Sequence, residues 1–128
     1  MKRIVDGDTF VVENGSKKGL KIRLIGVDAP ETRATGRRRI GYCGAEAKAY
    51  LFNLINGHTV ELTYDTVKKD RYGRTLAYVY KDGLFVNADL VKRGYACALT
   101  VPPNVKYAKL FVELERQARK NKRGLWRK

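Results

Sequence analysis

The stretch that decides the fold is residues 3–31, RIVDGDTFVVENGSKKGLKIRLIGVDAPE. Within it, residues 3–12 hold two short apolar runs, and the dipeptide Asn14-Gly15 that follows is typical of hairpin turns. Residues 20–27 then alternate between apolar and other side chains, which predicts a strand with one half-exposed face. We therefore expect the chain to begin with short strands, the last two joined as a hairpin.

The remaining sequence mixes strand and helix signals. Helices are expected over about residues 45–56, 88–93 and 105–122, and strands over 59–64, 76–80 and 84–86. Asn87 is expected to cap the short helix, and Asp82-Gly83 to form a type I′ turn. The expected apolar stripes are Ala47, Leu51, Leu54 and Ile55 on the first helix, and Tyr107, Leu110, Phe111, Leu114 and Ala118 on the last. Residues 33–44, rich in arginine and glycine, are expected to form a loop.

This order of elements favours an α+β protein that is mainly β, with a small Greek-key barrel rather than a parallel sheet. A length of 128 residues and a hydrophobic content of 44% suit a single domain over residues 1–128 with a real core. No apolar run approaches the ~18 residues that a membrane span needs. No signal-peptide pattern follows Met1, although a signal removed earlier stays open.

The chain is strongly basic, with 27 Lys and Arg against 13 Asp and Glu, which gives a net charge of +14. Such a charge indicates a polyanionic partner, with nucleic acid first and an anionic membrane second, while simple solubility is the alternative. His58 is the one histidine, so mechanisms with paired imidazoles are excluded. Cys43 and Cys97 lack CxxC spacing, which excludes a zinc site from cysteine alone and leaves two thiols or one disulfide open.

Acidic residues are scarce, so their grouping is informative. Asp6 and Asp8 lie near the start, and Asp28 and Glu31 follow the strand expected over residues 20–27. A hairpin would bring these two groups side by side. Two carboxylates with a backbone carbonyl suit a hard cation such as Ca²⁺, and a nearby Glu could serve as general base for a water molecule.

Two arginines accompany these acids. Arg23 lies five residues before Asp28, and Arg74 ends the run DRYGR that begins at Asp70. Planar, bidentate Arg donors stabilise the charge that gathers on a phosphodiester under attack. Two alternatives stay open: Arg23 is a solvated strand residue, and Arg74 forms a surface pair with Asp70.

Three ordered motifs, VDGDT at residues 5–9, RLIGVDAPE at 23–31 and DRYGR at 70–74, resemble the staphylococcal nuclease (thermonuclease) family. The resemblance extends over nearly the whole chain, as far as GLW at residues 124–126. It implies a five-stranded OB-fold Greek-key barrel with three α-helices. It also implies Ca²⁺-dependent hydrolysis of DNA and RNA, endo- and exonucleolytic, that leaves 3′-phosphate ends.

The resemblance also implies a role for each matching position. The implied site residues are Asp8, Asp28 and the Ala29 carbonyl for one Ca²⁺, Arg23, Glu31 and Arg74 for catalysis, and Arg71, Tyr72, Arg37, Arg38 and Arg39 for substrate binding. Glu31 would activate the attacking water, Arg23 and Arg74 would contact the phosphate, and Asp6 would be a further acid near the metal. Ala29 replaces a threonine of the best-known member, which should not abolish binding because the ligand is main chain.

A second departure from the family pattern concerns contacts with the nucleotide base. The two tyrosines with which the best-known member packs against the nucleotide have no counterpart in residues 98–102, ALTVP. Stacking on an aromatic ring is worth ~1–3 kcal/mol per base. We therefore expect weaker binding through that subsite, or a ring supplied by Tyr72, Tyr95 or Tyr107.

The alternative to an enzyme is a catalytically weak nuclease-like module that binds nucleic acid or protein. The acid, base and arginine set argues against it, because a pure binding module needs only charge. A membrane-surface protein is a third alternative, which the lack of an amphipathic segment with exposed large apolar side chains disfavours. We expect a monomer that acts on DNA and RNA. A weak Ca²⁺ site favours a secreted or extracytoplasmic protein, with the cytoplasm as the alternative.

Overall fold

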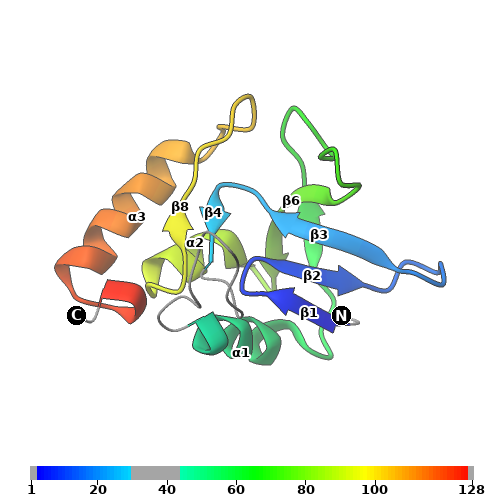
Figure 1. Ribbon diagram of the computed structural model, residues 1–128, viewed down its shortest axis with the longest axis horizontal. Helices are drawn as coiled ribbons and strands as arrows, with labels where there is room; N and C mark the ends of the chain where they lie inside the picture. The colour runs from blue at the N-terminus through cyan, green and yellow to red at the C-terminus, as the bar shows by residue number, and fades with distance from the viewer. Residues whose placement is uncertain (1–2, 30–43, 127–128) are drawn as a thin grey trace, which may run out of the picture.

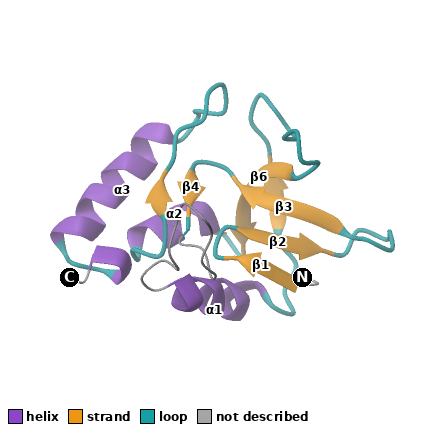
Figure 2. Ribbon diagram, viewed as in Figure 1, coloured by secondary structure: helices purple, strands orange, loops and turns teal. Residues whose placement is uncertain are grey.

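The computed structural model describes residues 3–29 and 44–126. The expectations for Glu31, Arg37, Arg38, Arg39 and Cys43 lie outside these residues. The strands are β1 (Arg3–Asp6), β2 (Thr9–Val12), β3 (Leu20–Leu24), β4 (Val27–Asp28), β5 (Glu61–Thr63), β6 (Thr75–Lys81), β7 (Leu84–Phe85) and β8 (Cys97–Ala98). The helices are α1 (Gly44–Ile55), α2 (Val86–Lys92), α3 (Ala108–Lys120) and the 3₁₀ turn η1 (Gly124–Trp126). An α+β protein with three α-helices is thus confirmed within the described residues (Figures 1 and 2).

The main sheet has the strand order β1-β2-β3-β6-β5, with β7 paired to β6. All its pairs are antiparallel except β3 with β6. A separate pair, β4 with β8, lies between this sheet and α3 (Figure 1). Within the described residues the edge strands β1 and β5 are not paired to each other, so closure into a barrel stays a prediction.

The expected hairpin around Asn14-Gly15 and the expected Asp82-Gly83 turn are confirmed. β2 and β3 pair around the loop that holds Asn14 and Gly15. The turn between β6 and β7 has Asp82 at φ 50° and Gly83 at φ 83°, the two positive values that a type I′ turn needs.

The single strand expected over residues 20–27 is wrong, because the chain bends at Gly26 between β3 and β4. Gly26 has φ +82°, and a Cβ there would lie 2.3 Å from the ring of Phe111. Glycine permits both the backbone conformation and the close approach of α3. The bend turns Asp28 out of the main sheet and into the β4–β8 pair.

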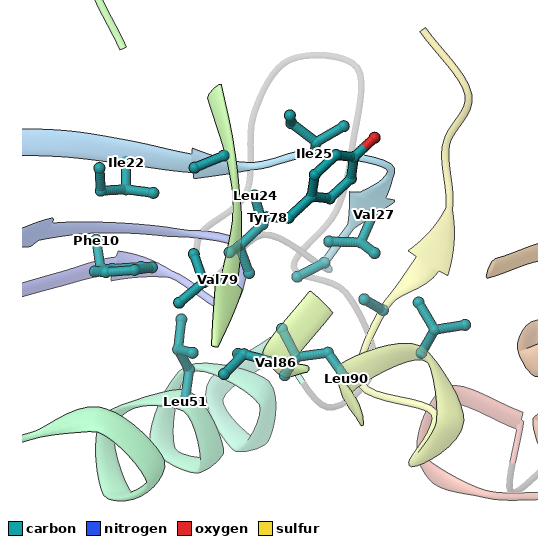
Figure 3. Packing of buried hydrophobic residues seen from close by; sticks show 14 of the residues in the cluster. Phe10, Ile22, Leu24, Ile25, Val27, Leu51, Tyr78, Val79, Val86 and Leu90 are labelled. Carbon is teal, nitrogen blue, oxygen red and sulfur yellow. The ribbon is translucent and has the colours of Figure 1, made fainter. Parts of the chain in front are cut away.

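The core lies between the main sheet and the helices, where Phe10, Ile22, Leu51 and Val86 meet (Figure 3). On α1, the expected stripe is confirmed in that Ala47, Leu51 and Ile55 are fully buried and Leu54 is half-buried. On α3, Phe111 and Ala118 are buried as expected. Leu110 is 41% exposed, so its place in the expected stripe is wrong. None of the described helices is long and apolar enough to cross a membrane.

The role expected for Asn87 as a helix cap is wrong. α2 begins at Val86, two residues before the expected start, and Asn87 is fully buried inside its first turn. Its Nδ2 donates to the carbonyls of Ile25 at 2.9 Å and Ala77 at 3.3 Å, and its Oδ1 accepts the N–H of Val79 at 2.9 Å. The Asn87 side chain therefore joins α2, β6 and the bend after β3. Only a polar side chain can pair with these buried backbone groups.

We predict that Asn87→Ala lowers the free energy of unfolding by about 3 kcal/mol, because each buried backbone group left unpaired costs ~1–3 kcal/mol. Urea unfolding followed by circular dichroism measures the change. Asn53→Ala on the exposed face of α1 is the matched control, with an expected change of about 0.5 kcal/mol or less. Equal effects of the two substitutions would contradict the bridging role of Asn87.

Candidate functional site

Arg23 lies at the centre of the candidate site, one residue before β3 ends. Its Nη1 donates to the carbonyls of Leu24 and Val27, each at 2.7 Å, so the side chain closes the bend between β3 and β4. Its Nη2 lies 3.6 Å from Asp8 Oδ2 and 3.5 Å from Asp28 Oδ1. The alternative of a solvated strand residue is wrong, because the Arg23 side chain is only 14% exposed.

Asp8 joins the turn after β1 to the chain after β3. Its Oδ1 accepts the hydroxyl of Thr9 at 2.9 Å, and its Oδ2 accepts the backbone N–H of Ala29 at 2.8 Å. Its own carbonyl accepts the N–H of Leu24 at 2.9 Å. The two acidic groups that the sequence places about twenty residues apart are therefore side by side, as the hairpin predicted.

These side chains surround a polar hollow of about 240 Å³. Among the described residues, the charged ones that line it are Asp6, Asp8, Lys21, Arg23, Asp28 and Arg74. Sequence reasoning missed Lys21, although its position two residues before Arg23 on the same strand could have indicated the same face. Arg74, from the loop before β6, is brought to the hollow by the parallel pairing of β3 with β6.

The Ca²⁺ implied by the sequence resemblance would need oxygen ligands. The carboxylates of Asp6, Asp8 and Asp28 line the hollow, together with Ala29, and no thiol or imidazole from residues 3–29 or 44–126 lines it. Among the described residues, no three His, Cys, Asp or Glu side chains are grouped closely enough to form a metal site by themselves. The oxygen donors of the described residues fit a hard cation held by two carboxylates, a carbonyl and water.

Arg74 pairs with Asp70 and lines the polar hollow as well. Arg74 Nε donates to Asp70 Oδ2 at 2.6 Å, and Asp70 Oδ1 accepts the backbone N–H groups of Tyr72 and Arg74 at 2.9 and 3.0 Å. Burial alone would raise the pKa of Asp70, but these bonds and the Arg74 charge lower it below the ordinary 3.8. An ion pair with Asp70 and a contact with a phosphate are therefore compatible roles for Arg74, because the ion pair orients its side chain.

Tyr72 lies beside this arginine on the surface. Tyr72 is 69% exposed, and the guanidinium groups of Arg71 and Arg74 lie 5.1 and 5.6 Å from its ring centre. Tyr107 instead packs edge-on against Tyr78 in the core. Of these two tyrosines, Tyr72 is the one near the candidate site.

An apolar pocket of about 390 Å³ adjoins the polar hollow, and Arg23 and Arg74 line both. Residues 23–27 line it, and two further walls come from the loop before β6 and from residues 99–104. Asn104 holds the two walls together, because it donates to the Val67 carbonyl and accepts the Val67 N–H, each at 2.8 Å. Leu99 and Val101, from the stretch that lacks the two tyrosines of the best-known family member, line this pocket.

The family described as staphylococcal nuclease homologue has a sequence model that matches residues 21–128. The chain belongs to this family. This staphylococcal nuclease homologue is 40% identical over 124 residues to a protein named thermonuclease from Staphylococcus hyicus, covering 97% of this chain and 72% of the relative. It is 37% identical over 126 residues to a thermonuclease from Staphylococcus intermedius, with 98% and 74% covered. It is also 37% identical over 131 residues to endonuclease YncB from Bacillus subtilis (strain 168), with 100% and 61% covered.

We predict that Asp70→Asn lowers the free energy of unfolding of this chain by about 1–2 kcal/mol at pH 7, since it removes a charged hydrogen-bond acceptor. Because the folded pKa of Asp70 lies below 3.8, its contribution is fully present above pH 3.8. It is lost as the pH falls through the lower folded pKa, so variant and wild type should converge in acid.

Urea unfolding at a series of pH values between 7 and 2 checks this. Asp82→Asn is the matched control, because the Asp82 side chain is 79% exposed and asparagine tolerates its positive φ. A gap between Asp70→Asn and wild type that stays constant with pH would contradict the ionised pair.

Proposed function

We propose that this chain is a Ca²⁺-dependent nuclease that hydrolyses DNA and RNA to products with 3′-phosphate ends. The observation that carries the proposal is the polar hollow in which Asp8 and Asp28 face Arg23, with Arg74 on its wall. Relatives named thermonuclease and endonuclease support it. The net charge of +14 suits a polyanionic substrate.

Asp8, Asp28 and the carbonyl of Ala29 would hold the Ca²⁺. When bound, the cation would neutralise charge on the scissile phosphate and fix its position. Asp8 is already oriented for this task, because Thr9 and the Ala29 N–H hold its two oxygens. Each carboxylate oxygen keeps a second lone pair for another partner.

Arg23 and Arg74 would contact the phosphate. Arg74 uses Nε for Asp70 and lines the hollow, so its two terminal nitrogens would be the donors to the phosphate. Among the described residues, Arg23 Nη2 makes only the two longer ion pairs, so a phosphate oxygen can compete for it. Planar donors of this kind stabilise the charge of the five-coordinate phosphorus.

Glu31, three residues after Asp28, is proposed to accept a proton from the attacking water. The water oxygen bonds to phosphorus, the bond from phosphorus to the 5′ oxygen breaks, and that oxygen leaves with a proton from solvent. The phosphate thereby stays on the 3′ side. Ala29 is the last described residue before Glu31, so the proposal for Glu31 rests on the resemblance.

The base would lie in the apolar pocket beside Arg74. Aliphatic walls at Leu99 and Val101 offer van der Waals contact but no ring, so affinity there should be modest. Tyr72 and Arg71 would flank the next nucleotide, and Arg37, Arg38 and Arg39 would contact phosphates. We further propose that the sheet closes as a five-stranded OB barrel, and that the protein acts outside the cytoplasm, where Ca²⁺ is abundant.

We predict that the protein degrades single-stranded DNA with Ca²⁺ and not with EDTA. Glu31→Gln should reduce turnover by roughly 10²–10⁴ while nucleotide binding stays, because a general base contributes about that much. Denaturing gels and end-group analysis of the products provide the measurement. Binding without any Ca²⁺-dependent cleavage would favour the nuclease-like binding module instead.

We also predict that Arg74→Lys lowers kcat by at least tenfold with a smaller change in KM, because lysine retains the charge and loses the planar fork of donors. Steady-state kinetics on a short DNA substrate provide the measurement. The matched control is Arg116→Lys, at an exposed ion pair with Glu113 on α3, which should leave kcat unchanged. Wild-type kcat in Arg74→Lys, with a loss of stability alone, would show that Arg74 is only a partner for Asp70.

A further inference from the structure

The tripeptide Lys-Arg-Gly occurs twice, at residues 92–94 and 122–124, and the fold packs the two copies together. The N–H of Leu125 donates to the Gly94 carbonyl at 2.7 Å. A Cβ at Gly94 would lie 2.2 Å from the facing backbone, and one at Gly124 would lie 2.3 Å from it. Both glycines also have positive φ, +80° and +51°, so glycine is required at the contact.

This contact creates a basic hollow of about 480 Å³, lined by Lys92, Arg93, Tyr95, Lys122 and Arg123. The four basic residues are exposed, and Tyr95 is half-buried. None of the acidic side chains in the described part of the chain lines the hollow. Four cations gathered from the ends of two helices make a strong local site for anions.

Two of the four cations are held in place. Arg123 Nη1 donates to the carbonyl of Lys92 at 3.2 Å, which ties the second tripeptide to the first. Arg93 Nε donates to the buried carboxylate of Asp89 at 3.1 Å, and this carboxylate neutralises part of the positive charge of Arg93. Among the described residues, Lys92, Lys122 and Arg123 form no ion pair with a carboxylate. Three charges therefore stay available to a ligand.

An aromatic ring belongs to the same hollow. Tyr95 stacks on Tyr50 with ring centres 4.7 Å apart, and the guanidinium of Arg93 lies 5.7 Å from the Tyr50 ring centre. Asp89 accepts the hydroxyl of Tyr50, so the stack is fixed to α2. Basic side chains beside an anchored ring are the combination that binds single strands, with phosphates on the cations and a base on the ring.

The hollow lies at the end of β8 that adjoins the candidate active site. Tyr95 is two residues before Cys97, and Cys97 pairs with Asp28 of the polar hollow. β8 therefore connects the two hollows along the chain, so we expect a strand of several nucleotides to contact both. Figure 1 shows β8 beside β4 with α3 on its outer side.

We propose that the basic hollow is a second docking subsite that binds single-stranded nucleic acid flanking the cleaved bond. The identity of the ligand rests on the proposed nuclease function. A purely structural role is the competing explanation, since cations also stabilise helix C-termini. That role would affect stability without affecting binding of a long strand.

The test variant is the triple substitution Lys92→Gln/Lys122→Gln/Arg123→Gln. The control is Lys17→Gln/Lys18→Gln/Lys109→Gln, which removes the same charge at exposed positions on other parts of the surface. Binding of a fluorescent 20-nucleotide oligo(dT) is measured in EDTA at several NaCl concentrations. Three lost phosphate contacts should make the slope of log K against log[salt] shallower by about 2, at ~0.7 per phosphate. The control triple should change the slope by less than half as much.

Tyr95 is tested by Tyr95→Leu and Tyr95→Phe on the same oligonucleotide and on a duplex of equal length. Tyr95→Leu should weaken single-strand binding about 5- to 150-fold, the range for one stacked base, while Tyr95→Phe keeps the ring and the affinity. Neither change should affect binding of the duplex. Thermal unfolding of each variant verifies that it is folded, and Tyr95→Phe remains informative if Tyr95→Leu is not.

The outcomes separate this proposal from the nuclease proposal, because binding in EDTA needs no catalysis. A shallower slope in the first triple alone supports the docking subsite even if the protein cleaves nothing. Equal slopes in both triples, or equal loss on single strand and duplex in Tyr95→Leu, would overturn it even if the protein is an active nuclease. Turnover of a dinucleotide with Ca²⁺ should be unchanged in the first triple.

Discussion

One guanidinium group, that of Arg23, holds the candidate site together. It donates to two carbonyls across the bend after β3 and lies within 3.6 Å of two carboxylates. Two carboxylates this close would repel each other without a cation between them, and the bend would lose its donors. The bend in turn places Asp28 beside Asp8, so the local backbone, the acidic pair and the polar hollow all depend on the same side chain.

Two different environments meet at Arg23 and Arg74. On one side lies the polar hollow with its carboxylates, and on the other lies the apolar pocket whose walls Asn104 joins. A nucleotide has the same division, with a charged phosphate and a flat, weakly polar base. The arrangement therefore suits a ligand that is anionic at one end and apolar at the other, which is the physical basis for the proposed substrate class.

The positive charge of the chain is organised by the fold rather than spread evenly. Two Lys-Arg-Gly tripeptides thirty residues apart meet through their glycines and gather four cations around Tyr95. Other arginines are committed to carboxylates, such as Arg74 to Asp70 and Arg116 to Glu113. The paired arginines orient side chains or support helices. Within the described residues, Lys92, Lys122 and Arg123 form no ion pair with a carboxylate, and together with Arg93 they form a surface for a polyanion.

Sequence alone determined the features that local chemistry controls. The hairpin of β2 and β3, the Asp82-Gly83 turn and the buried face of α1 follow from residue period and turn chemistry, and the motifs around Asp8, Asp28 and Arg74 indicated the site. Only the tertiary structure decided the rest. Asn87 bridges the core because Ile25 and Ala77 come to it from distant segments. β3 ends at Leu24, before the bend at Gly26 where the Phe111 ring of a distant helix packs. The place of Tyr95 in a basic hollow likewise depends on two helix ends that meet in space, which no local pattern encodes.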